Sequence, residues 1–248
     1  MTIAIVGGTG YTFLSAFREI EARDVETPYG APSGPVRRGH LFGTEILFLA
    51  RHGAGDPLPP HKVNYRANLA ALKAFGASEI LALNAVGGIH PEMGPGRLVL
   101  ADDIIDYTYG REHTLWTERA AHLHVDMQPP YAENLRKRVI AAAAQAQVAL
   151  VARGVYGATQ GPRLETAAEI RRMRSDGCDV VGMTGMPEAG LARELGIPYA
   201  SLCLVANWAA GLSAREITMA EVFEHLRASG TEVGKLLEMF LEPGPIRS

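Results

Sequence analysis

The stretch "VGMTGMPEAGLARELGIPYASLCLVANW", from Val181 to Trp208, decides the fold class. It begins in a short apolar run, continues through a segment suited to a helix, and ends in a second apolar run at Ala200–Val205. Pro187 near the start of the middle segment and Gly196 at its end have the polarity expected of helix end signals. The stretch therefore predicts a strand, a helix and another strand in succession.

The same alternation extends along the whole chain. Short apolar runs rich in β-branched residues predict strands at Ile3–Val6, Glu45–Leu49, Glu79–Leu83, Leu98–Leu100, Leu150–Val155, Val180–Met183 and Ala200–Val205. The intervening segments predict helices at Tyr65–Gly76, Glu133–Gln147, Thr166–Gly177, Met186–Gly196 and Thr218–Glu242. We expect a single α/β domain over residues 1–248, with a mixed, mostly parallel central sheet flanked by helices.

The composition restricts the class of protein. The chain has 248 residues, of which 47% are hydrophobic and 21% charged, as in an ordinary globular domain. Its net charge is −3 and it has no run of Lys or Arg, so we expect no nucleic-acid partner. The two cysteines, Cys178 and Cys203, form no C-x-x-C pair, which argues against a disulfide or a metal site. Neither a membrane span nor a signal peptide is recognisable, so we expect no membrane association and a cytoplasmic protein.

Polar residues and glycines follow most of the expected strands, where ligands of parallel sheets collect. One set suits an oxyanion, because glycines expose backbone N–H groups and an arginine fork can bind two oxygens. Its members are Thr9, Arg51, His52, the Ala85 backbone N–H and Thr184, and together they predict a site for inorganic phosphate. The alternatives are a tight turn at Thr9 and a solvated loop at Arg51. A nicotinamide-dependent oxidoreductase is disfavoured, because Phe13 breaks the G-x-G-x-x-G pattern.

A second pair of strand-end residues suits a purine. Glu165 carries an acceptor-only carboxylate, whereas the Asn207 amide both donates and accepts. A 6-oxopurine presents an N1–H donor to the carboxylate and O6 and N7 to the amide. Adenine would instead direct its N1 lone pair at the carboxylate, which is repulsive. The alternative is that Asn207 caps a turn and Glu165 starts a helix.

The chain resembles the trimeric purine nucleoside phosphorylases, and most closely their 5′-methylthioadenosine phosphorylase branch. The resemblance is carried, in order along the chain, by "VGGTG", "ETPYGAPSGPV", "LARHG", "HKVNYRANLAALKAFG", "NAVGGI", "GPRLETAAEIR", "VGMTGMPEAGLARELGIPYASLCLVANW" and "ITMAEVFEHL". It implies reversible phosphorolysis of an N-glycosidic bond with phosphate as co-substrate and with neither a metal nor another cofactor. It also implies a homotrimer in which a neighbour completes each site, for which His122–Tyr131 is the candidate segment.

The resemblance also assigns roles to residues. Thr9, Arg51, His52, Ala85 and Thr184 fall on phosphate positions, and Met183 falls on the position against the ribose. Leu164 replaces the usual aromatic residue beside the base. Methylthioadenosine phosphorylases usually carry aspartates where Asn207 and Ala209 stand, whereas 6-oxopurine phosphorylases carry Glu and Asn at the positions of Glu165 and Asn207. The chain thus resembles the methylthioadenosine phosphorylases overall but has the base-contacting residues of the 6-oxopurine phosphorylases.

The ribose 5′ end provides a further distinction. Met219 and Val222 fall where the methylthio branch has apolar residues, and His225 is expected on the helix surface. Leaving a 5′-hydroxyl unpaired against such a wall costs roughly 1–3 kcal/mol. We therefore expect phosphorolysis of 5′-methylthioinosine, with Asn207, Arg51 and His52 as catalytic residues. A methylthioadenosine phosphorylase, an inosine/guanosine phosphorylase and a non-catalytic purine sensor remain as alternatives.

Overall fold

The computed structural model describes residues 2–8, 12–55, 57–116, 124–213 and 218–242. Its strands are β1 Ile3–Gly7, β2 Arg18–Arg23, β3 Val36–Leu41, β4 Thr44–Ala50, β5 Glu79–Gly88, β6 Leu98–Leu100, β7 Asp103–Asp106, β8 Leu150–Val151, β9 Val155–Ala158, β10 Val180–Gly182 and β11 Tyr199–Trp208. Its α-helices are α1 Tyr65–Ala74, α2 Glu133–Gln145, α3 Ala167–Ser175, α4 Gly185–Glu194 and α5 Met219–Leu241. Two short 3-10 helices lie at η1 Thr12–Ala16 and η2 Pro60–Lys62.

The described strands form one mixed sheet, as the sequence predicts. Along its main path the order is β2-β3-β4-β1-β5-β10-β9-β7, and β11, β6 and β8 extend it from the other edge of β5. The pairs β1–β4, β1–β5, β5–β11, β9–β10, β7–β9 and β6–β8 are parallel, whereas β5–β10, β6–β11, β2–β3 and β3–β4 are antiparallel. Parallel pairing therefore dominates in the described part of the sheet.

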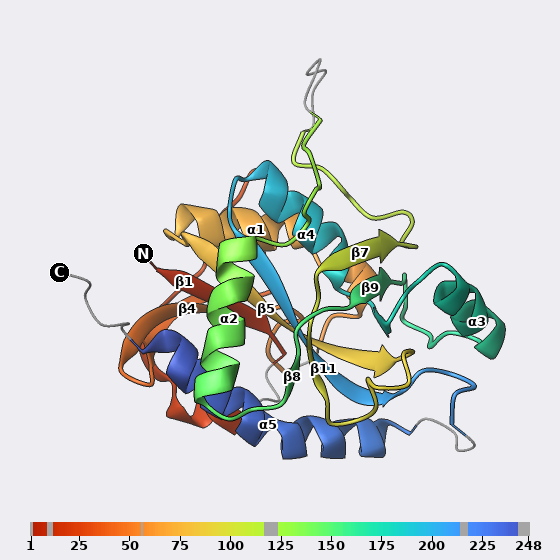
Figure 1. Cartoon of the computed structure of the whole chain (residues 1–248). Helices are drawn as coiled ribbons and strands as arrows, with labels where there is room; N and C mark the ends of the chain where they lie inside the picture. The colour runs from red at the N-terminus through yellow and green to blue at the C-terminus, as the bar shows by residue number, and fades with distance from the viewer. Residues whose placement is uncertain (1, 9–11, 56, 117–123, 214–217, 243–248) are drawn as a thin grey trace.

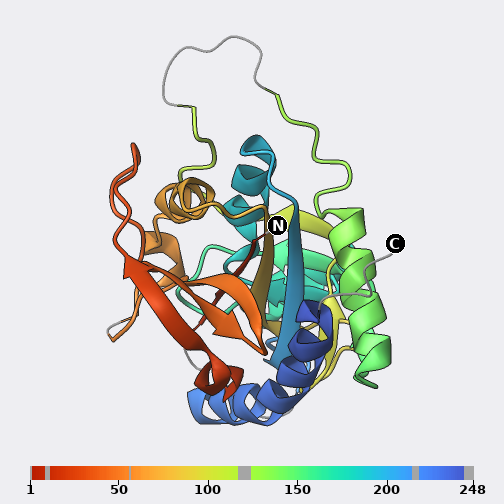
Figure 2. The same cartoon turned by 90° about the vertical axis from the view of Figure 1, so that its left-hand side faces the viewer.

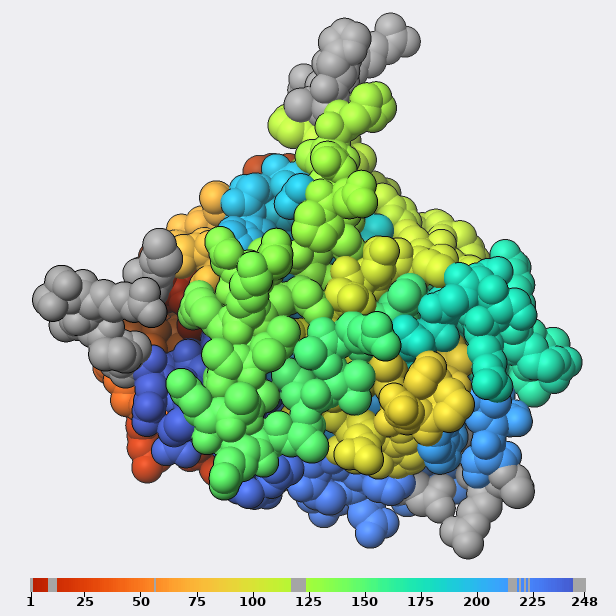
Figure 3. All heavy atoms as spheres, in the orientation of Figure 1, coloured from red at the N-terminus to blue at the C-terminus, as the bar shows by residue number. Residues whose placement is uncertain are grey.

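Helices cover both faces of the sheet (Figures 1 and 2). On one face α1 and α4 pack through Leu69, Leu72 and Leu191 against the sheet. On the other face α2 and α5 pack through Leu135 and Leu236, and Figure 3 shows α2 in green above α5 in blue. The shorter α3 lies at the far end of the sheet, beyond β9 (Figure 1). No helix in the described ranges has the length and hydropathy of a membrane span.

All seven expected strands and all five expected α-helices are present, but β5 continues past the expected Leu83 to Gly88, and β11 continues past the expected Val205 to Trp208. The expected strand Leu150–Val155 is divided into β8 and β9, which pair with different neighbours. Three strands, β2, β3 and β7, were not expected, because "REIEAR", "VRRGHL" and "DIID" are rich in charge and lack a continuous apolar run. Strands β2 and β7 are the two ends of the main path and pair on one edge only, and charged side chains are common on such edge strands.

Candidate active site

The site lies where the sheet divides along β5. The first strand, β1, pairs with β5 only as far as Ala82, and β10 joins the same edge of β5 only at Gly87. Between these points Leu83–Val86 pairs with β11 on one edge alone. The other edge has no strand partner there. Its backbone groups lie at the carboxyl ends of β1 and β4, which is the usual ligand position in such sheets.

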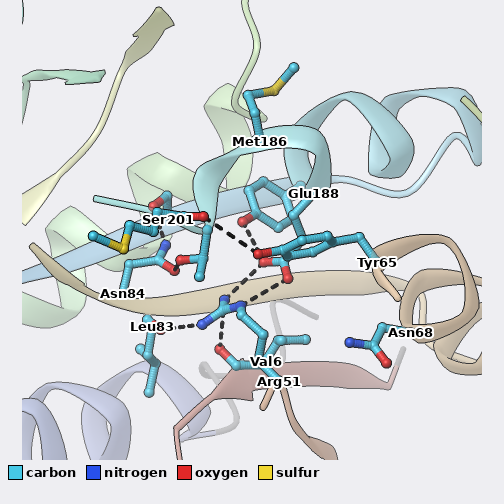
Figure 4. A network of polar contacts seen from close by, with 12 residues as sticks. Val6, Arg51, Tyr65, Asn68, Leu83, Asn84, Met186, Glu188 and Ser201 are labelled. Carbon is cyan, nitrogen blue, oxygen red and sulfur yellow. Dashed lines mark hydrogen bonds and ion pairs between the residues drawn. The ribbon is translucent and has the colours of Figure 1, made fainter. Parts of the chain in front are cut away.

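A buried ion pair fills part of this division (Figure 4). Arg51 follows β4 and is 2% exposed, and Glu188 from α4 is fully buried. The Nε and Nη2 atoms of Arg51 donate to the two carboxylate oxygens of Glu188, both at 2.9 Å. Tyr199 donates its hydroxyl to Glu188 Oε2 at 2.8 Å. Burial would lower the pKa of Arg51, but the charge and hydrogen bonds of Glu188 outweigh it and raise that pKa, so Arg51 stays charged.

The arginine fork that the sequence suggested for two phosphate oxygens holds Glu188 instead. Arg51 Nη1 donates to the Leu83 carbonyl at 3.0 Å, and Nη2 lies 3.4 Å from the Val6 carbonyl oxygen. Guanidinium has five N–H donors, so these contacts leave one N–H of Nη1 for a ligand. The role of Arg51 in binding phosphate stays a prediction. Arg51 would donate one hydrogen bond to phosphate rather than the two expected from the sequence. A buried guanidinium is usually paired with an acid. The sequence analysis did not predict that Glu188 is the acid paired with Arg51.

His52 stands beside Arg51 at the mouth of this region. Its Nδ1 lies 2.8 Å from the Leu58 carbonyl oxygen, which can only accept, so Nδ1 carries the proton. Burial first, and then the charge of Arg51, hold the pKa of His52 below its ordinary value. The ring is therefore neutral at neutral pH, and its Nε2 atom presents a lone pair.

Thr184 lies at the end of β10, but its polar groups are used within the protein. Its hydroxyl donates to Asn84 Oδ1 at 2.8 Å, and its backbone N–H donates to the Tyr156 hydroxyl at 3.3 Å. Asn84 in turn donates to Ser201 at 2.7 Å. Burial raises the pKa of Tyr156 to about 12, so this hydroxyl is neutral. Thr184 is thus bonded to Asn84, which Figure 4 shows beside Ser201, and the Thr184 hydroxyl proton already has an acceptor.

The remaining phosphate candidates differ in what the structure says of them. Thr9 lies outside the described residues. Ala85 is exposed, on the stretch of β5 that pairs on one edge only. Successive strand residues turn their backbone groups to opposite edges, so Ala85 shares its edge with Leu83, whose carbonyl meets Arg51. The Ala85 N–H is therefore on the open edge, as the phosphate prediction requires.

Asn207 sits at a β-bulge rather than in a turn. Strand β11 continues through it to Trp208, and the register against β5 shifts between Val205 and Asn207. A bulge re-aims the following side chain. A Cβ built on Gly87 would lie 3.3 Å from Asn207 Nδ2 and 3.2 Å from Val181, so the amide lies over Gly87 on the side of β10. Nδ2 also donates to the Trp208 carbonyl at 2.8 Å.

Glu165 also points toward the end of β10. Helix α3 begins at Ala167 and is capped by Thr166 and Glu169, so the helix start makes no use of the Glu165 side chain. Its Oε1 accepts from the Thr159 hydroxyl at 2.6 Å, and the Thr159 backbone N–H donates to the Gly182 carbonyl at 2.8 Å. Glu165 and Asn207 thus both approach β10, from opposite sides.

The residues expected to contact the sugar and the base differ in their surroundings. Met183 is partly buried, and its sulfur lies 2.5 Å from a Cβ built on Gly161, which has φ +62°. Only glycine leaves room for the thioether there. Leu164 is 44% exposed beside Glu165. Val222 is partly buried on α5; the side chain of Met219 lies outside what the structure describes.

Two residues make contacts that the sequence did not indicate, and the role of His122–Tyr131 at a neighbouring subunit stays a prediction. His225 is not a free surface residue, because its Nδ1 lies 2.7 Å from the carbonyl of Ala206, the residue inside the bulge. Tyr131, at the end of the segment expected to reach a neighbour, is 1% exposed and stacks on Tyr199 with ring centres 6.1 Å apart. Of the same segment, His122 and Leu123 lie outside the described residues.

A family model for the phosphorylase superfamily matches residues 2–242. The chain belongs to the phosphorylase superfamily. This phosphorylase is 56% identical over 239 residues to a probable S-methyl-5′-thioinosine phosphorylase of Xanthomonas campestris pv. campestris, with 96% of each chain covered. It is 46% identical over 242 residues to a 6-oxopurine nucleoside phosphorylase of Pyrococcus furiosus, with 95% of this chain and 90% of the other covered.

A solved structure has the same fold. The phosphorylase superposes on methylthioadenosine phosphorylase from Schistosoma mansoni in complex with adenine with a TM-score of 0.92 and 32% identity. The match covers 97% of this chain and 91% of the other. The single-domain α/β fold expected from the sequence is confirmed. Among the described residues no cluster of His, Cys, Asp or Glu could hold a metal ion.

Proposed function

We propose that this phosphorylase cleaves 5′-methylthioinosine with inorganic phosphate, giving hypoxanthine and 5-methylthioribose 1-phosphate. The observation that carries the proposal is the approach of Glu165 and Asn207 to the end of β10 from two sides. The relatives named for S-methyl-5′-thioinosine at 54–56% identity support the same substrate. The reaction requires phosphate as co-substrate and no other cofactor.

The purine is read by charge and by hydrogen-bond polarity. The Glu165 carboxylate has one oxygen engaged by Thr159 and accepts the purine N1–H at the other. Asn207 donates to O6 or N7 through its amide once the local bond to Trp208 is exchanged. An amino-purine presents a lone pair to Glu165, and two acceptors facing each other repel. The site therefore prefers the 6-oxopurine.

The chemical step makes the sugar positive and the purine negative, and the site stabilises both charges. As the C1′–N9 bond lengthens, the sugar becomes positive and the purine becomes negative. Phosphate at the open edge of β5, beside Arg51 and the Ala85 N–H, stabilises the sugar cation and then attacks it. Neutral His52 accepts a hydrogen bond from a phosphate hydroxyl at Nε2 and so orients the nucleophile. Asn207 stabilises the developing charge on the leaving purine.

The sugar side of the site favours a 5′-thioether. Met183 against Gly161 and Val222 on α5 are apolar, as the 5′-methylthio group requires. A free 5′-hydroxyl there would lose its water hydrogen bonds, at a cost of roughly 1–3 kcal/mol. We also propose a homotrimer; the exposed aromatic side chains of Tyr109 and Trp116 support a subunit contact, and light scattering would test it. A cytoplasmic location stays a prediction from composition.

The test is a comparison of three nucleosides with phosphate. We expect kcat/KM to be highest for methylthioinosine, lower for inosine and lowest for methylthioadenosine. The second candidate, methylthioadenosine phosphorylase, is favoured by the close structural match to that enzyme and predicts the reverse order for the two thio-nucleosides. Equal or faster cleavage of inosine would identify a general 6-oxopurine phosphorylase instead. Tight hypoxanthine binding without phosphate-dependent cleavage of any nucleoside would identify a sensor.

A further inference from the structure

The Arg111 guanidinium joins two loops that carry the proposed substrate contacts. Its Nη1 donates to the carbonyls of Met183 at 2.8 Å and Met186 at 2.6 Å. Its Nη2 donates to the carbonyls of Gln160 at 2.7 Å and Thr159 at 3.2 Å. Its Nε donates to the Gln160 side-chain oxygen at 3.1 Å. One side chain thus ties the loop after β9 to the turn after β10.

Arg111 makes these bonds without an acidic partner. Among the described residues no carboxylate forms an ion pair with it, and its aromatic neighbour is Tyr65, whose ring centre lies 5.4 Å from the guanidinium carbon. The planar fork of five donors suits carbonyls that approach from two directions, which a single ammonium could not match. The side chain is therefore built to hold backbone, not to neutralise a charge.

Thr159 connects this clamp to the carboxylate. Its N–H donates to Gly182, its carbonyl accepts from Arg111, and its hydroxyl donates to Glu165 Oε1 at 2.6 Å. That length is typical of an O–H bond to a charged carboxylate. The backbone of Thr159 is thus held on both sides, and of the two acceptors near its hydroxyl, the Gly182 carbonyl at 3.3 Å and Glu165 Oε1 at 2.6 Å, the carboxylate oxygen is the nearer. The second oxygen of Glu165, Oε2, accepts no hydrogen bond from any described residue.

We propose that Arg111 and Thr159 are positioning residues for purine recognition. Arg111 fixes the backbone of Thr159, and the Thr159 hydroxyl holds one oxygen of Glu165 so that the other faces the purine N1–H. Neither residue touches the substrate; they reduce the freedom that the carboxylate would otherwise lose on binding. This inference rests on the proposed function, because it names how the same site selects its base.

The first experiment compares Thr159→Val with Thr159→Ser. The valine variant keeps the shape and loses the hydroxyl, and we expect its kcat/KM for methylthioinosine to fall about tenfold. The serine variant keeps the donor and should stay within about threefold of the wild type. The KM for phosphate should be unchanged in both. Thr44→Val is the matched control, because Thr44, in β4, donates its hydroxyl to the carbonyl of Leu241, in α5, at 2.7 Å. Losing that bond should change neither constant.

A double-mutant cycle separates positioning from general damage. If Thr159 acts through Glu165, Thr159→Val should add no further loss in a Glu165→Ala background. A loss of the same size in both backgrounds, or a valine variant with wild-type kcat/KM, would overturn the proposal. If the wild type cleaves methylthioinosine and only the variants behave unexpectedly, the proposed function stands and the positioning role fails. If the wild type does not cleave it, both fail.

Arg111→Lys tests the other half of the clamp. The charge remains but the fork is lost, and we expect about a tenfold loss of kcat/KM for methylthioinosine with the melting temperature recorded in parallel. Arg163→Lys is the control, because Arg163 lies on the loop after β9, is exposed, and pairs with Glu169. A well-folded Arg111→Lys protein that matches Arg163→Lys in kcat/KM would contradict the role given to Arg111.

Discussion

Replacing Glu188 by glutamine should destabilise the fold strongly while barely changing its shape. Glu188 is fully buried and accepts two hydrogen bonds of 2.9 Å from Arg51 and one of 2.8 Å from Tyr199. A glutamine in its place has one acceptor and one N–H₂ donor, so a donor would face a donor. Arg51 does not relieve the loss by deprotonating, because a guanidinium stays charged in proteins even without an acidic partner.

The magnitude follows from leaving a guanidinium buried without its counter-ion. Arg51 is 2% exposed and would keep the carbonyls of Leu83 at 3.0 Å and Val6 at 3.4 Å and one neutral glutamine oxygen, but no negative charge. Removing one partner of such a pair typically costs about 3–5 kcal/mol. For a domain of this size each kcal/mol lowers the melting temperature by about 2–4 °C, so a fall of roughly 6–20 °C is expected.

Thermal and urea unfolding of the purified variant measure this loss. Glu133→Gln is the control, because Glu133 forms an exposed ion pair with Lys137 one helical turn away. Removing that surface charge should leave the melting temperature within experimental error of the wild type. If Glu188→Gln unfolds within 2 °C of Glu133→Gln, roughly the effect of a single kcal/mol, the buried pair does not have the structural weight assigned to it.

Three further predictions concern the site. Asn207→Asp should lower kcat on methylthioinosine by about 100-fold and raise cleavage of methylthioadenosine, and initial rates that keep the wild-type pattern would refute the base-reading role. The fold lowers the pKa of His52 below its ordinary 6.5, so the unfolded chain takes up the proton first and stability falls as the pH drops below about 6.5. Urea unfolding of His52→Gln between pH 7.5 and 5.5 should show a weaker decline than the wild type, and equal slopes would contradict this. His225→Ala removes the bond to Ala206 beside the bulge and should lower kcat on methylthioinosine about tenfold with an unchanged KM for phosphate; a wild-type kcat would exclude that bracing role.

The fold was largely predictable because its central strands are buried on both faces. Continuous apolar runs such as Ile3–Val6 and Ala200–Val205 have no alternative to burial, and Pro187 marks the start of regular helix after the extended Met186. The edge strand β2, "REIEAR", was not predictable from such a pattern. It gains its structure from pairing with β3, whose charged side chains support it through contacts such as Arg37 with Glu19.

The candidate site residues could be chosen from the sequence, but their hydrogen bonds could not, and their roles stay predictions. The residues that follow the expected strands include Arg51, Thr184, Glu165 and Asn207. Arg51 and Thr184 come close because β10 runs antiparallel to β5, so that Thr184 bonds to Asn84 beside Leu83, whose carbonyl meets Arg51. The sequence could not show that Arg51 pairs with a residue 137 positions away, or that a bulge at Ala206 re-aims the next side chain. Both depend on three-dimensional register. The sequence did contain a sign of the Arg51–Glu188 pair. Glu188 directly follows Pro187 among mostly apolar helix residues, and a buried acid there needs a cationic partner.

The most direct test of base recognition is a crystal structure with hypoxanthine and phosphate bound. We predict that a Glu165 oxygen lies about 2.7–3.2 Å from N1 and that the Asn207 amide lies within the same range of O6 or N7. Phosphate should lie at the open edge of β5, in contact with the Ala85 N–H. A well-ordered purine with both side chains turned away from it would contradict the account.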